Sequence, residues 1–553
     1  MSSDNTGNNS PFSYREVYLP ESTGKNAAKL GLNSIDQSWG IWGHNLHDVL
    51  PEKPSEGIYA KVNGNTIKKQ YCFSSQRLFD YITDYIDDRY DSDESAFFSI
   101  IPNDNDVVCL CIRCTQAGNS HGDASPAVFN MVRKLATYYP NHVFFTSDYR
   151  TTRGLPEEAL PKNAGVMVSA MPYPFTLAKT PEEQNFINTL NNWSRKTDRI
   201  MVWDYINNFD DYFTPYPIFG VMQSRLKNYR DNNVTAVFMN GSGTDASSFS
   251  KLKSVVLAEL LKNPDADWRE IVRTKSKEIY PKAGETIADF IIAQEDYVEK
   301  NNVSLPMYEG VPVALKTYLP KDLFEPFYRK LATQRALATG EEHRDLDILL
   351  AELALTQLEI NRITGQLRDS EDLLRQLEHL QAENIEAYSE SGWRIDNYVT
   401  DYRYLLRHAN ETNEHNKLRG VSLVALTPLD PEYKDLSVIT DGVLSIPSNY
   451  HNGLLITSPE DYTQIAIPNP HGAKKLVVWL AYNTGYKIYL PELVTLSGEG
   501  MHKEVQTPEY PKDYTGHCKV EFDIPSSVTG NLVLTLYKDP ETRSMASEEV
   551  EMF

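Results

Sequence analysis

The chain has 553 residues, enough for about three domains at a typical size of roughly 100–200 residues each. Its 54 Lys and Arg residues against 76 Asp and Glu residues give a formal net charge of −22. A surface of that sign repels phosphate backbones and anionic lipid, so we expect neither nucleic acid nor a membrane surface as a partner. The 33 Tyr, 20 Phe and 7 Trp residues supply ample material for a core, which excludes a disordered chain.

The cysteine spacing and the hydropathy pattern argue against two further classes of protein, a disulfide-rich domain and a membrane-spanning protein. Three of the 5 cysteines lie within residues 109–114, a spacing that does not indicate a disulfide framework. No apolar run reaches the roughly 18 residues that a membrane span needs. No basic-then-apolar signal segment opens the chain, whose polar residues 1–10 are expected to form a flexible tail.

From Phe12 to about residue 300, short apolar runs alternate with amphipathic helical patterns. This alternation predicts an α/β fold, a (β/α)8 TIM-like barrel over residues 11–310, with an open doubly wound sheet as the alternative. Two of the eight strands are expected within Trp39–Cys72, where the pattern is weakest. The other strands are predicted at Tyr14–Leu19, Phe97–Ile101, Val143–Ser147, Val166–Ala170, Ile200–Trp203 and Ala236–Met239.

The remaining chain divides into a helical and an all-β part. Leucine and isoleucine recur at three- and four-residue steps through residues 311–425, which predicts a set of antiparallel helices. Gly365 and Gly392 interrupt the pattern and disfavour a heptad coiled coil. Residues 426–553 contain short strand patterns such as Lys475–Tyr482 and Asn531–Lys538 between Gly-containing turns, which predicts a β-sandwich.

A CxCxxC motif, Cys109-Leu110-Cys111-Ile112-Arg113-Cys114, is the first candidate site. Thiolates at this spacing can bind one tetrahedral ion from a single tight turn, with Cys72 as the fourth ligand and His121 in reserve. We favour structural zinc over the alternative of buried or free thiols. Sulfur atoms about 3.5–4 Å apart would fit such a site.

Acidic residues directly beyond the predicted strands form the second candidate site. Asp104, Asp148 and Asp204 follow three different strands, and barrels build their active sites at the carboxyl ends of strands. Asp104 and Asp204 are predicted to face each other across the mouth, with Asp148 able to replace either. Such a pair could cleave a glycosidic bond. The alternative is that these residues only form turns or cap loops.

Aromatic and polar residues are predicted at the same end of the barrel. Flat rings stack on sugar faces and forked polar groups bind hydroxyls, so this combination favours a carbohydrate site. Simple core packing is the alternative. The candidate substrate-binding residues are Arg15, Trp39, Trp42, His44, Tyr149, Arg150, Trp203, Tyr205 and Asn208.

Several common functional motifs are absent. The sequence contains no Walker loop, no GxGxxG after a strand, no HExxH and no GxSxG elbow. We therefore expect no organic cofactor.

The order of several segments resembles the domain-of-unknown-function 4838 family of bacterial proteins, many of them from Bacteroidetes. The segments are Tyr14–Tyr18, Trp42–His44, Asn103–Asn105 before the cysteines, Trp203–Pro217 and Leu260–Asp267. The resemblance implies a glycoside-hydrolase-like barrel, similar to those of hexosaminidases and alpha-glucuronidases, and an exported, periplasmic or cell-surface location. It assigns no catalytic residues, so the carboxylate prediction depends on barrel geometry alone.

The C-terminal part resembles a galactose-binding, discoidin-like sandwich. The resemblance lies in Asp441-Gly442 and in Ile488–Val494 followed by Ser497–Gly500. It implies a carbohydrate-binding module or a packing domain. Exposed aromatics such as Tyr450 or Tyr486 would mark a sugar site on a separable sandwich.

Three functions fit these patterns. The first is a glycoside hydrolase that acts on an oligo- or polysaccharide through paired carboxylates. The second is a non-catalytic carbohydrate-binding protein of the same fold. The third is a polypeptide-interaction scaffold, which would show a sizeable exposed apolar patch.

Overall fold

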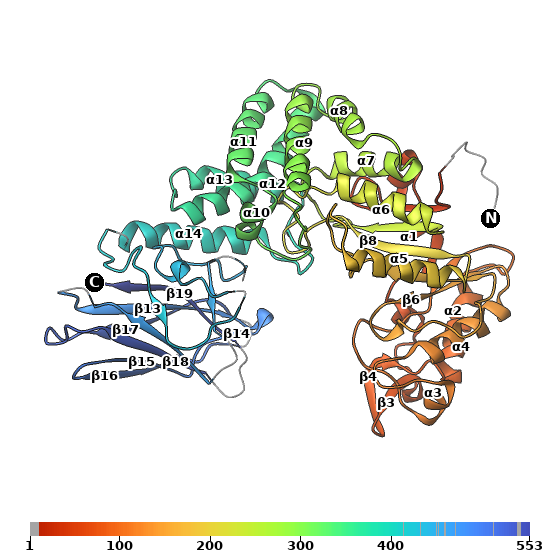
Figure 1. Ribbon diagram of the computed structural model, residues 1–553, viewed down its shortest axis with the longest axis horizontal. Helices are drawn as coiled ribbons and strands as arrows, with labels where there is room; N and C mark the ends of the chain where they lie inside the picture. Colours follow the sequence, from red (N-terminus) through yellow and green to blue (C-terminus); the bar gives the residue numbers. More distant parts are fainter. Residues whose placement is uncertain are drawn as a thin grey trace. The chain divides into compact units, whose positions relative to one another are not determined.

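The computed structural model describes residues 10–553 except 413, 432, 450, 452, 458–460, 470–471, 512–513 and 539–543. The described chain forms two compact units (Figure 1). The first contains the chain up to Asn207 together with Tyr216–Met307. The second contains Asn208–Pro215 together with Tyr308–Phe553, so the helical region and the sandwich belong to one unit.

A sheet of seven parallel strands is the centre of the first unit, in the order β1-β9-β8-β7-β6-β5-β2. Six of these strands are the apolar runs predicted from the sequence. Their composition suits strands that are covered on both faces. The strands are β1 (Tyr14–Tyr18), β2 (Trp39–Ile41), β5 (Phe97–Ser99), β6 (Val143–Asp148), β7 (Ala164–Ser169), β8 (Ile200–Tyr205) and β9 (Ala236–Asn240).

The prediction of an eighth strand in the barrel is wrong. The Trp39–Cys72 stretch supplies only β2 to the sheet, and its other strands, β3 (Tyr59–Val62) and β4 (Asn65–Tyr71), form a separate antiparallel hairpin. Five of the seven residues of β4 are not buried, whereas a barrel strand is covered on both faces. Strands β1 and β2 are therefore the two edges of the sheet and do not pair with each other. In place of the predicted closed (β/α)8 barrel, the described residues form an open sheet of seven parallel strands.

The sheet curves around an aromatic core. Side chains from β1, β2, β6, β7, β8 and β9 meet in one cluster, which includes Tyr14, Trp39, Phe145, Met201 and Phe238. Tyr14 and Trp39 come from the two opposite edges, yet their ring centroids lie 6.2 Å apart. Side chains alternate between the two faces of a strand, so the neighbours of these inward residues face the helices.

The helices of the first unit start at recognisable signals. Ser75 accepts a hydrogen bond from Leu78 N at the start of α2, and Thr180 caps α5, whose first residue is Pro181. The helices are α1 (Ile35–Ser38), α2 (Gln76–Arg89), α3 (Ile112–Ala117), α4 (Ser125–Tyr138), α5 (Pro181–Ser194), α6 (Phe219–Asp231), α7 (Ser250–Lys262), α8 (Trp268–Ile279) and α9 (Gly284–Lys300).

Helices form the first part of the second unit, as the leucine spacing predicts. Gly365 ends the longest helix in the left-handed conformation, at φ 67°, which a residue with a side chain rarely adopts. No helix within the described ranges has both the length and the apolar character needed to cross a membrane. The helices are α10 (Val311–Thr317), α11 (Lys321–Arg335), α12 (Gly340–Thr364), α13 (Ser370–Ala382) and α14 (Ile395–Thr412).

Two five-stranded sheets form the predicted sandwich. They enclose a core of aliphatic side chains such as Leu480, Leu496 and Leu534. One sheet has the order β10-β12-β18-β15-β16 and the other β11-β19-β14-β13-β17, with β13 also paired to β19. The strands are β10 (Val424–Ala425), β11 (Leu455–Ile456), β12 (Tyr462–Ile467), β13 (Lys475–Asn483), β14 (Ile488–Tyr489), β15 (Leu493–Gly498), β16 (Met501–Gln506), β17 (Thr515–Asp523), β18 (Leu532–Tyr537) and β19 (Ser544–Met552).

The contact between α14 and the last strand, β19, is polar. Glu551 accepts hydrogen bonds from Trp479 Nε1 at 2.9 Å and lies 2.9 Å from His408 Nε2 on α14. Glu549 accepts from the backbone of Gly442 at 3.1 Å and from Asn416 Nδ2 at 3.4 Å. The sandwich therefore packs on α14 through the buried carboxylate of Glu551 and also through Tyr404, which packs against Trp479.

Candidate functional site

Three aromatic rings lie at the carboxyl end of the curved sheet. Trp42 follows β2 and stacks on Trp203 of β8, with ring centroids 4.9 Å apart and an interplanar angle of 16°. Phe238 of β9 contacts both indoles, at 4.5 Å and 4.8 Å. Gly43 has a φ of 54°, and a Cβ there would lie 3.4 Å from the Trp203 ring. The two half-exposed indoles therefore cap the aromatic core at the mouth.

Polar side chains from the loops after β2, β5 and β6 contact one another at the same end of the sheet. His44 Nδ1 lies 2.6 Å from the carbonyl of Pro102, and its ring centroid is 6.1 Å from that of Tyr149. Arg150, at φ 46°, contacts Asp104 at 3.2 Å. The structure thus brings together four of the predicted site residues from the loops after β2, β5 and β6.

Asp204 does not lie among them. Trp203 points into the core, so the next side chain on β8 faces the helices. There Asp204 is fully buried, forms an ion pair with Arg225 of α6, and accepts a hydrogen bond from Tyr229 at 2.5 Å. Asp104 and Asp204 therefore do not face each other across the mouth, and this carboxylate connects β8 to α6.

Asp148 faces the helices for the same reason. Its carboxylate accepts a hydrogen bond from Trp193 Nε1 of α5 at 2.5 Å. Burial raises the pKa of Asp148 to about 6, while the bond from Trp193 acts in the opposite direction. The structure gives this residue a packing position beside α5.

Two predicted substrate contacts lie elsewhere. Arg15 faces outward from β1 and donates to the carbonyls of Phe12 and Gly31, at 2.8 Å and 2.9 Å. Asn208 belongs to the second unit, where its Nδ2 donates to the carbonyl of Glu309 at 2.6 Å. Tyr205 does project to the inner face and lies 3.5 Å from the hydroxyl of Ser169.

The sequence predicts two aromatic residues, Tyr450 and Tyr486, for a sugar site on the sandwich. Tyr450 lies outside the described residues. Tyr486 packs edge-on against Trp393, with ring centroids 5.3 Å apart.

A hydrogen-bonded group that sequence analysis missed closes the gap between β1 and β2. Glu16 accepts from the Tyr14 hydroxyl and from the backbone of Ile35, the latter at 2.9 Å, and Trp39 Nε1 donates to the Tyr14 oxygen at 3.1 Å. Burial raises the pKa of Glu16 to about 7. These side-chain hydrogen bonds connect the region of β1 with that of β2, two strands that share no backbone hydrogen bonds in the described sheet. The one signal in the sequence is an acid inside an apolar run, Tyr14–Leu19.

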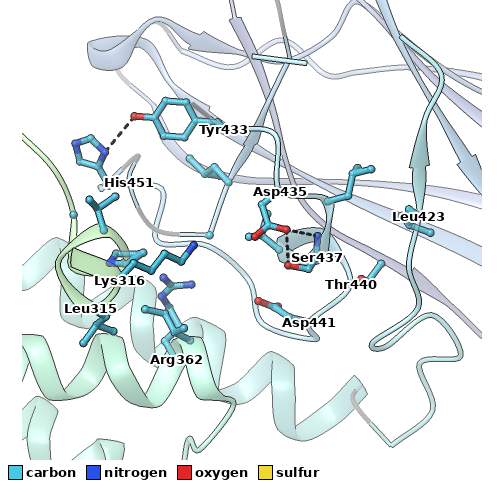
Figure 2. A pocket seen from close by; sticks show the side chains of 18 of the residues that line it. Leu315, Lys316, Arg362, Leu423, Tyr433, Asp435, Ser437, Thr440, Asp441 and His451 are labelled. Carbon is cyan, nitrogen blue, oxygen red and sulfur yellow. Dashed lines mark hydrogen bonds between the residues drawn. The ribbon is translucent and has the colours of Figure 1, made fainter. Parts of the chain in front are cut away.

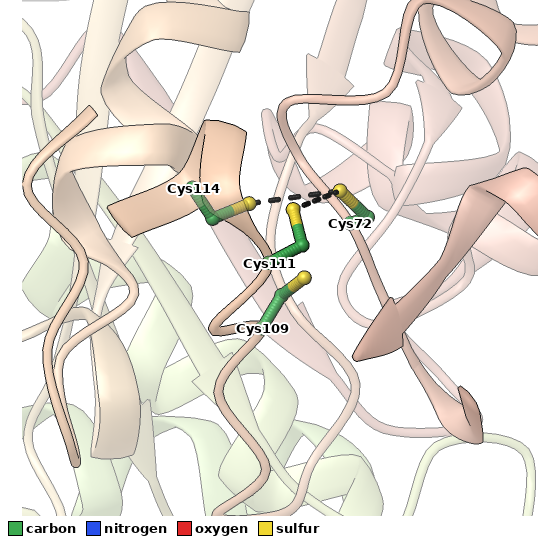
Figure 3. A group of neighbouring side chains, drawn as sticks. All are labelled: Cys72, Cys109, Cys111 and Cys114. Atoms are coloured by element: carbon green, nitrogen blue, oxygen red, sulfur yellow. Dashed lines mark hydrogen bonds between the residues drawn. The ribbon is translucent and has the colours of Figure 1, made fainter. Parts of the chain in front are cut away.

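The four cysteines of the predicted metal site converge (Figure 3). Cys72 follows β4, Cys109 and Cys111 lie in the loop before α3, and Cys114 lies on α3. Their sulfur atoms all lie within 4.8 Å of one another, with Cys72 Sγ 3.7 Å from Cys111 Sγ and 3.6 Å from Cys114 Sγ. Tetrahedral zinc, at about 2.3 Å per bond, requires sulfur atoms about 3.8 Å apart.

This cluster adjoins the mouth through the β3–β4 hairpin. Gln70, two residues before Cys72, donates to the carbonyl of Asn103 at 3.0 Å and accepts from its backbone amide at 3.0 Å. Asn105 Nδ2 donates to the carbonyl of Lys69 at 3.0 Å. The cluster and β4 therefore hold the loop that carries Asp104.

Comparison with known proteins identifies the class of the chain. A family described as a domain of unknown function, DUF4838, matches residues 4–291. The chain belongs to this family. A comparison with curated proteins gives no match.

Three solved structures whose descriptions refer to carbohydrates are distantly similar to this chain. A GH138 enzyme targeting pectin rhamnogalacturonan II is 10% identical, with 90% of this chain and 79% of that chain covered and a TM-score of 0.31. The lectin domain of lectinolysin, complexed with Lewis B antigen, is 16% identical over 25% of this chain and 96% of its own, with a TM-score of 0.20. A Streptococcus pneumoniae fucose-binding module is 12% identical over 25% and 96%, with a TM-score of 0.19.

Proposed function

We propose that the protein binds complex carbohydrate at the mouth of its seven-stranded sheet. The observation that carries this proposal is that the loops at the carboxyl end of the sheet contain a stacked Trp42–Trp203 pair and two polar contacts, His44 with Tyr149 and Arg150 with Asp104. Rings that cover sugar faces, next to forked donors and acceptors for hydroxyls, are the chemistry that a sugar needs.

Binding of soluble polysaccharides tests the proposal. We expect affinity electrophoresis in gels with pectic and other plant polysaccharides to retard the protein. The Arg150→Ala variant should lose at least about tenfold in affinity, because a hydrogen bond to a charged group contributes about 1.5–3 kcal/mol. Arg195→Ala is the matched control, since Arg195 is exposed beyond the end of α5, in the loop that leads to the amino end of β8 and so away from the mouth. Equal retardation of both variants would overturn the proposal.

Hydrolysis of the bound glycan is the second candidate, and one observation favours it. Arg150 contacts two carboxylates of the same loop, Asp104 at 3.2 Å and Asp106 at 3.9 Å. Two acids held by one guanidinium could share the acid and base roles.

Substitution of these acids tests the second candidate. On any polysaccharide that the protein cleaves, Asp104→Asn should lower turnover by at least about a hundredfold, the low end for general acid–base catalysis. Asp148→Asn, whose carboxylate faces α5, should retain turnover. Full turnover by Asp104→Asn would exclude this acid from the reaction, and the absence of cleavage of any polysaccharide would leave binding as the function.

We further propose that the four-cysteine cluster holds a structural zinc ion. The sulfur spacing fits it, and Cys109 Sγ also accepts a hydrogen bond from the backbone amide of Lys61 at 3.3 Å, which stabilises a thiolate. Bound zinc would fix the β3–β4 hairpin against α3.

Metal analysis tests the zinc proposal. Plasma mass spectrometry should find about one zinc per chain, and Cys111→Ser should lose it. Cys518→Ser is the control, because Cys518 is buried in the sandwich core, away from the cluster. Zinc-free protein with four freely titratable thiols in the cluster would contradict this assignment.

A further inference from the structure

The second unit contains a pocket of about 970 Å³ whose walls come from both its helices and its sandwich (Figure 2). Pro312, Val313 and Leu315 of α10 form an apolar side, and Leu423 and Leu436 line the sandwich side. Ligand pockets span roughly 300–1,000 Å³ and combine such apolar walls with a few fixed polar groups. The size alone therefore suits a small organic ligand.

One polar group of this pocket is a buried arginine in a fixed position. Arg362, near the end of α12, is 2% exposed, and its Nε and Nη2 both donate to Glu359 at 3.0 Å. Glu359 is held in turn by the Tyr398 hydroxyl at 2.7 Å. A Cβ on Gly453 would lie 2.7 Å from Nη1 of the arginine, so the glycine leaves room for the guanidinium. The arginine is therefore a rigid donor at the pocket wall.

Acceptors and hydroxyls lie on the opposite wall. Asp435 accepts from the amide and hydroxyl of Ser437, at 3.0 Å and 2.6 Å, and the same hydroxyl lines the pocket. Asp441 accepts from Val443 N at 2.8 Å. Burial raises the pKa of Asp441 to about 7, so near neutrality this group both donates and accepts hydrogen bonds. Figure 2 shows Lys316 and Arg362 across the pocket from these acids.

A hydrogen-bonded chain fixes the third side of the pocket. The Tyr433 hydroxyl lies 3.2 Å from His451 Nδ1, and His451 Nε2 lies 2.5 Å from Asp210. The Asp210 carboxylate accepts a hydrogen bond, so Nε2 of His451 is the donor, and Nδ1 of the neutral ring then accepts a hydrogen bond from the tyrosine hydroxyl. The Tyr433 side chain, which lines the pocket, is thus held in one orientation.

The charges of the lining decide the class of ligand. Lys316 and Arg362 stand against Glu309, Asp435 and Asp441, so the pocket has no excess of positive charge to attract an anion. Donors and acceptors are instead interspersed, which suits adjacent hydroxyl groups. We propose that this pocket binds an uncharged polyhydroxylated ligand, the end of a neutral glycan chain, at a site separate from the mouth of the parallel sheet.

Saturation-transfer NMR on the full chain tests this site, with millimolar methyl glycosides of glucose, galactose, mannose and fucose as probes. We expect transfer to at least one of them. Val313→Trp fills the pocket from α10 and should abolish the transfer. Lys316→Ala should weaken binding about tenfold, the value of one charged hydrogen bond. Lys330→Ala, an exposed lysine on α11 that does not line the pocket, should bind like the unchanged protein.

Three outcomes would overturn the proposal. One is the absence of transfer to any neutral glycoside. Another is transfer that survives in Val313→Trp, which would assign binding to a different site such as the mouth. The third is exclusive binding of methyl galacturonoside or glucuronoside, added as charged probes. None of these outcomes depends on the polysaccharide retardation that Arg150→Ala tests, so the two sites succeed or fail separately.

Discussion

Two strands, β8 of the first unit and β19 of the second, each carry a fully buried acidic side chain, Asp204 and Glu549. The groups around these two acids differ. Asp204 on β8 meets a cation, Arg225, and a phenol, Tyr229. Glu549 on β19 meets only the neutral groups of Gly442 and Asn416, and its second oxygen is buried without a partner.

The difference shows that burial of a carboxylate does not by itself indicate a catalytic or a stabilising role. A cation beside the acid compensates for lost hydration, and removal of one partner then leaves an uncompensated charge. Without a cation the acid retains its proton: burial, and then the nearby charges of Asp441 and Glu551, raise the pKa of Glu549 well above its usual value. Substitution of the two acids should therefore have opposite effects.

The largest effect is expected for Asp204→Asn. It leaves the buried Arg225 guanidinium without its partner, which should lower the free energy of unfolding of the first unit by about 3–5 kcal/mol. Urea unfolding, followed by hydrogen exchange in β8, measures this loss. Asp198→Asn, an exposed acid before the same strand, is the control. A loss below about 1 kcal/mol, the range of exposed ion pairs, would contradict the assigned role of the buried pair.

Glu549→Gln should act in the opposite direction. The amide oxygen still accepts from Gly442, and the amide does not ionise in either state. At pH 8 we expect the second unit to gain about 1–2 kcal/mol, because in the unchanged protein the unfolded chain releases a proton that the folded state retains, and the substitution removes this cost. The gain should vanish below about pH 4, where the unchanged residue is protonated in both the folded and the unfolded chain. Destabilisation at pH 8 would show that the carboxylate is required as an anion.

The pH dependence of the second unit provides a further test. The pKa of Asp441 is raised from 3.8 to about 7, so the folded state holds a proton that the unfolded chain releases. Stability is then greatest below about pH 4 as far as this group is concerned, and it falls as the pH rises to about 7. Asp441→Asn should flatten this fall. Hydrogen exchange in β19, corrected for its intrinsic pH dependence, measures it, and an unchanged slope would exclude Asp441 as the titrating group.

The smallest effect is expected for Asp104→Asn. Asp104 is more than half exposed in its contact with Arg150, and exposed ion pairs contribute only about 0–1 kcal/mol. The midpoint of thermal unfolding should stay within about 2 °C of the original value. This variant can therefore test sugar binding and hydrolysis without a folding defect, unlike Asp204→Asn. A large drop would mean that the rim loop depends on this pair.

Six of the seven strands of the parallel sheet could be predicted from the sequence, because a short continuous apolar run is typical of a strand that is covered on both faces. It also predicted the cysteine cluster, since CxCxxC and Cys72 offer a complete ligand set. It failed where chemistry depends on which face a residue takes. Trp203, Asp204 and Tyr205 are adjacent, yet alternation places the rings at the mouth and the acid against α6.

Other features depend on distant partners that no local pattern encodes. His451 and Asp210 are 241 residues apart in the sequence, and only the fold brings their side chains into contact. The sequence analysis predicts two barrel strands within Trp39–Cys72, and this prediction failed for the β3–β4 hairpin because its strand propensity resembles that of a barrel strand. Only its exposed polar residues, Lys68 and Lys69 among them, distinguish it.

The opening between β1 and β2 also has a mechanical consequence. Within the described sheet, β1 is hydrogen-bonded as a strand only to β9, over the five residue pairs from Tyr14–Ala236 to Tyr18–Asn240. A tensile load applied at the amino-terminal side would therefore work against one ladder and the Glu16–Tyr14–Trp39 contacts. A closed barrel would oppose the same load with two ladders. In the described sheet, β1 is thus held by one backbone ladder, as is the other edge strand, β2.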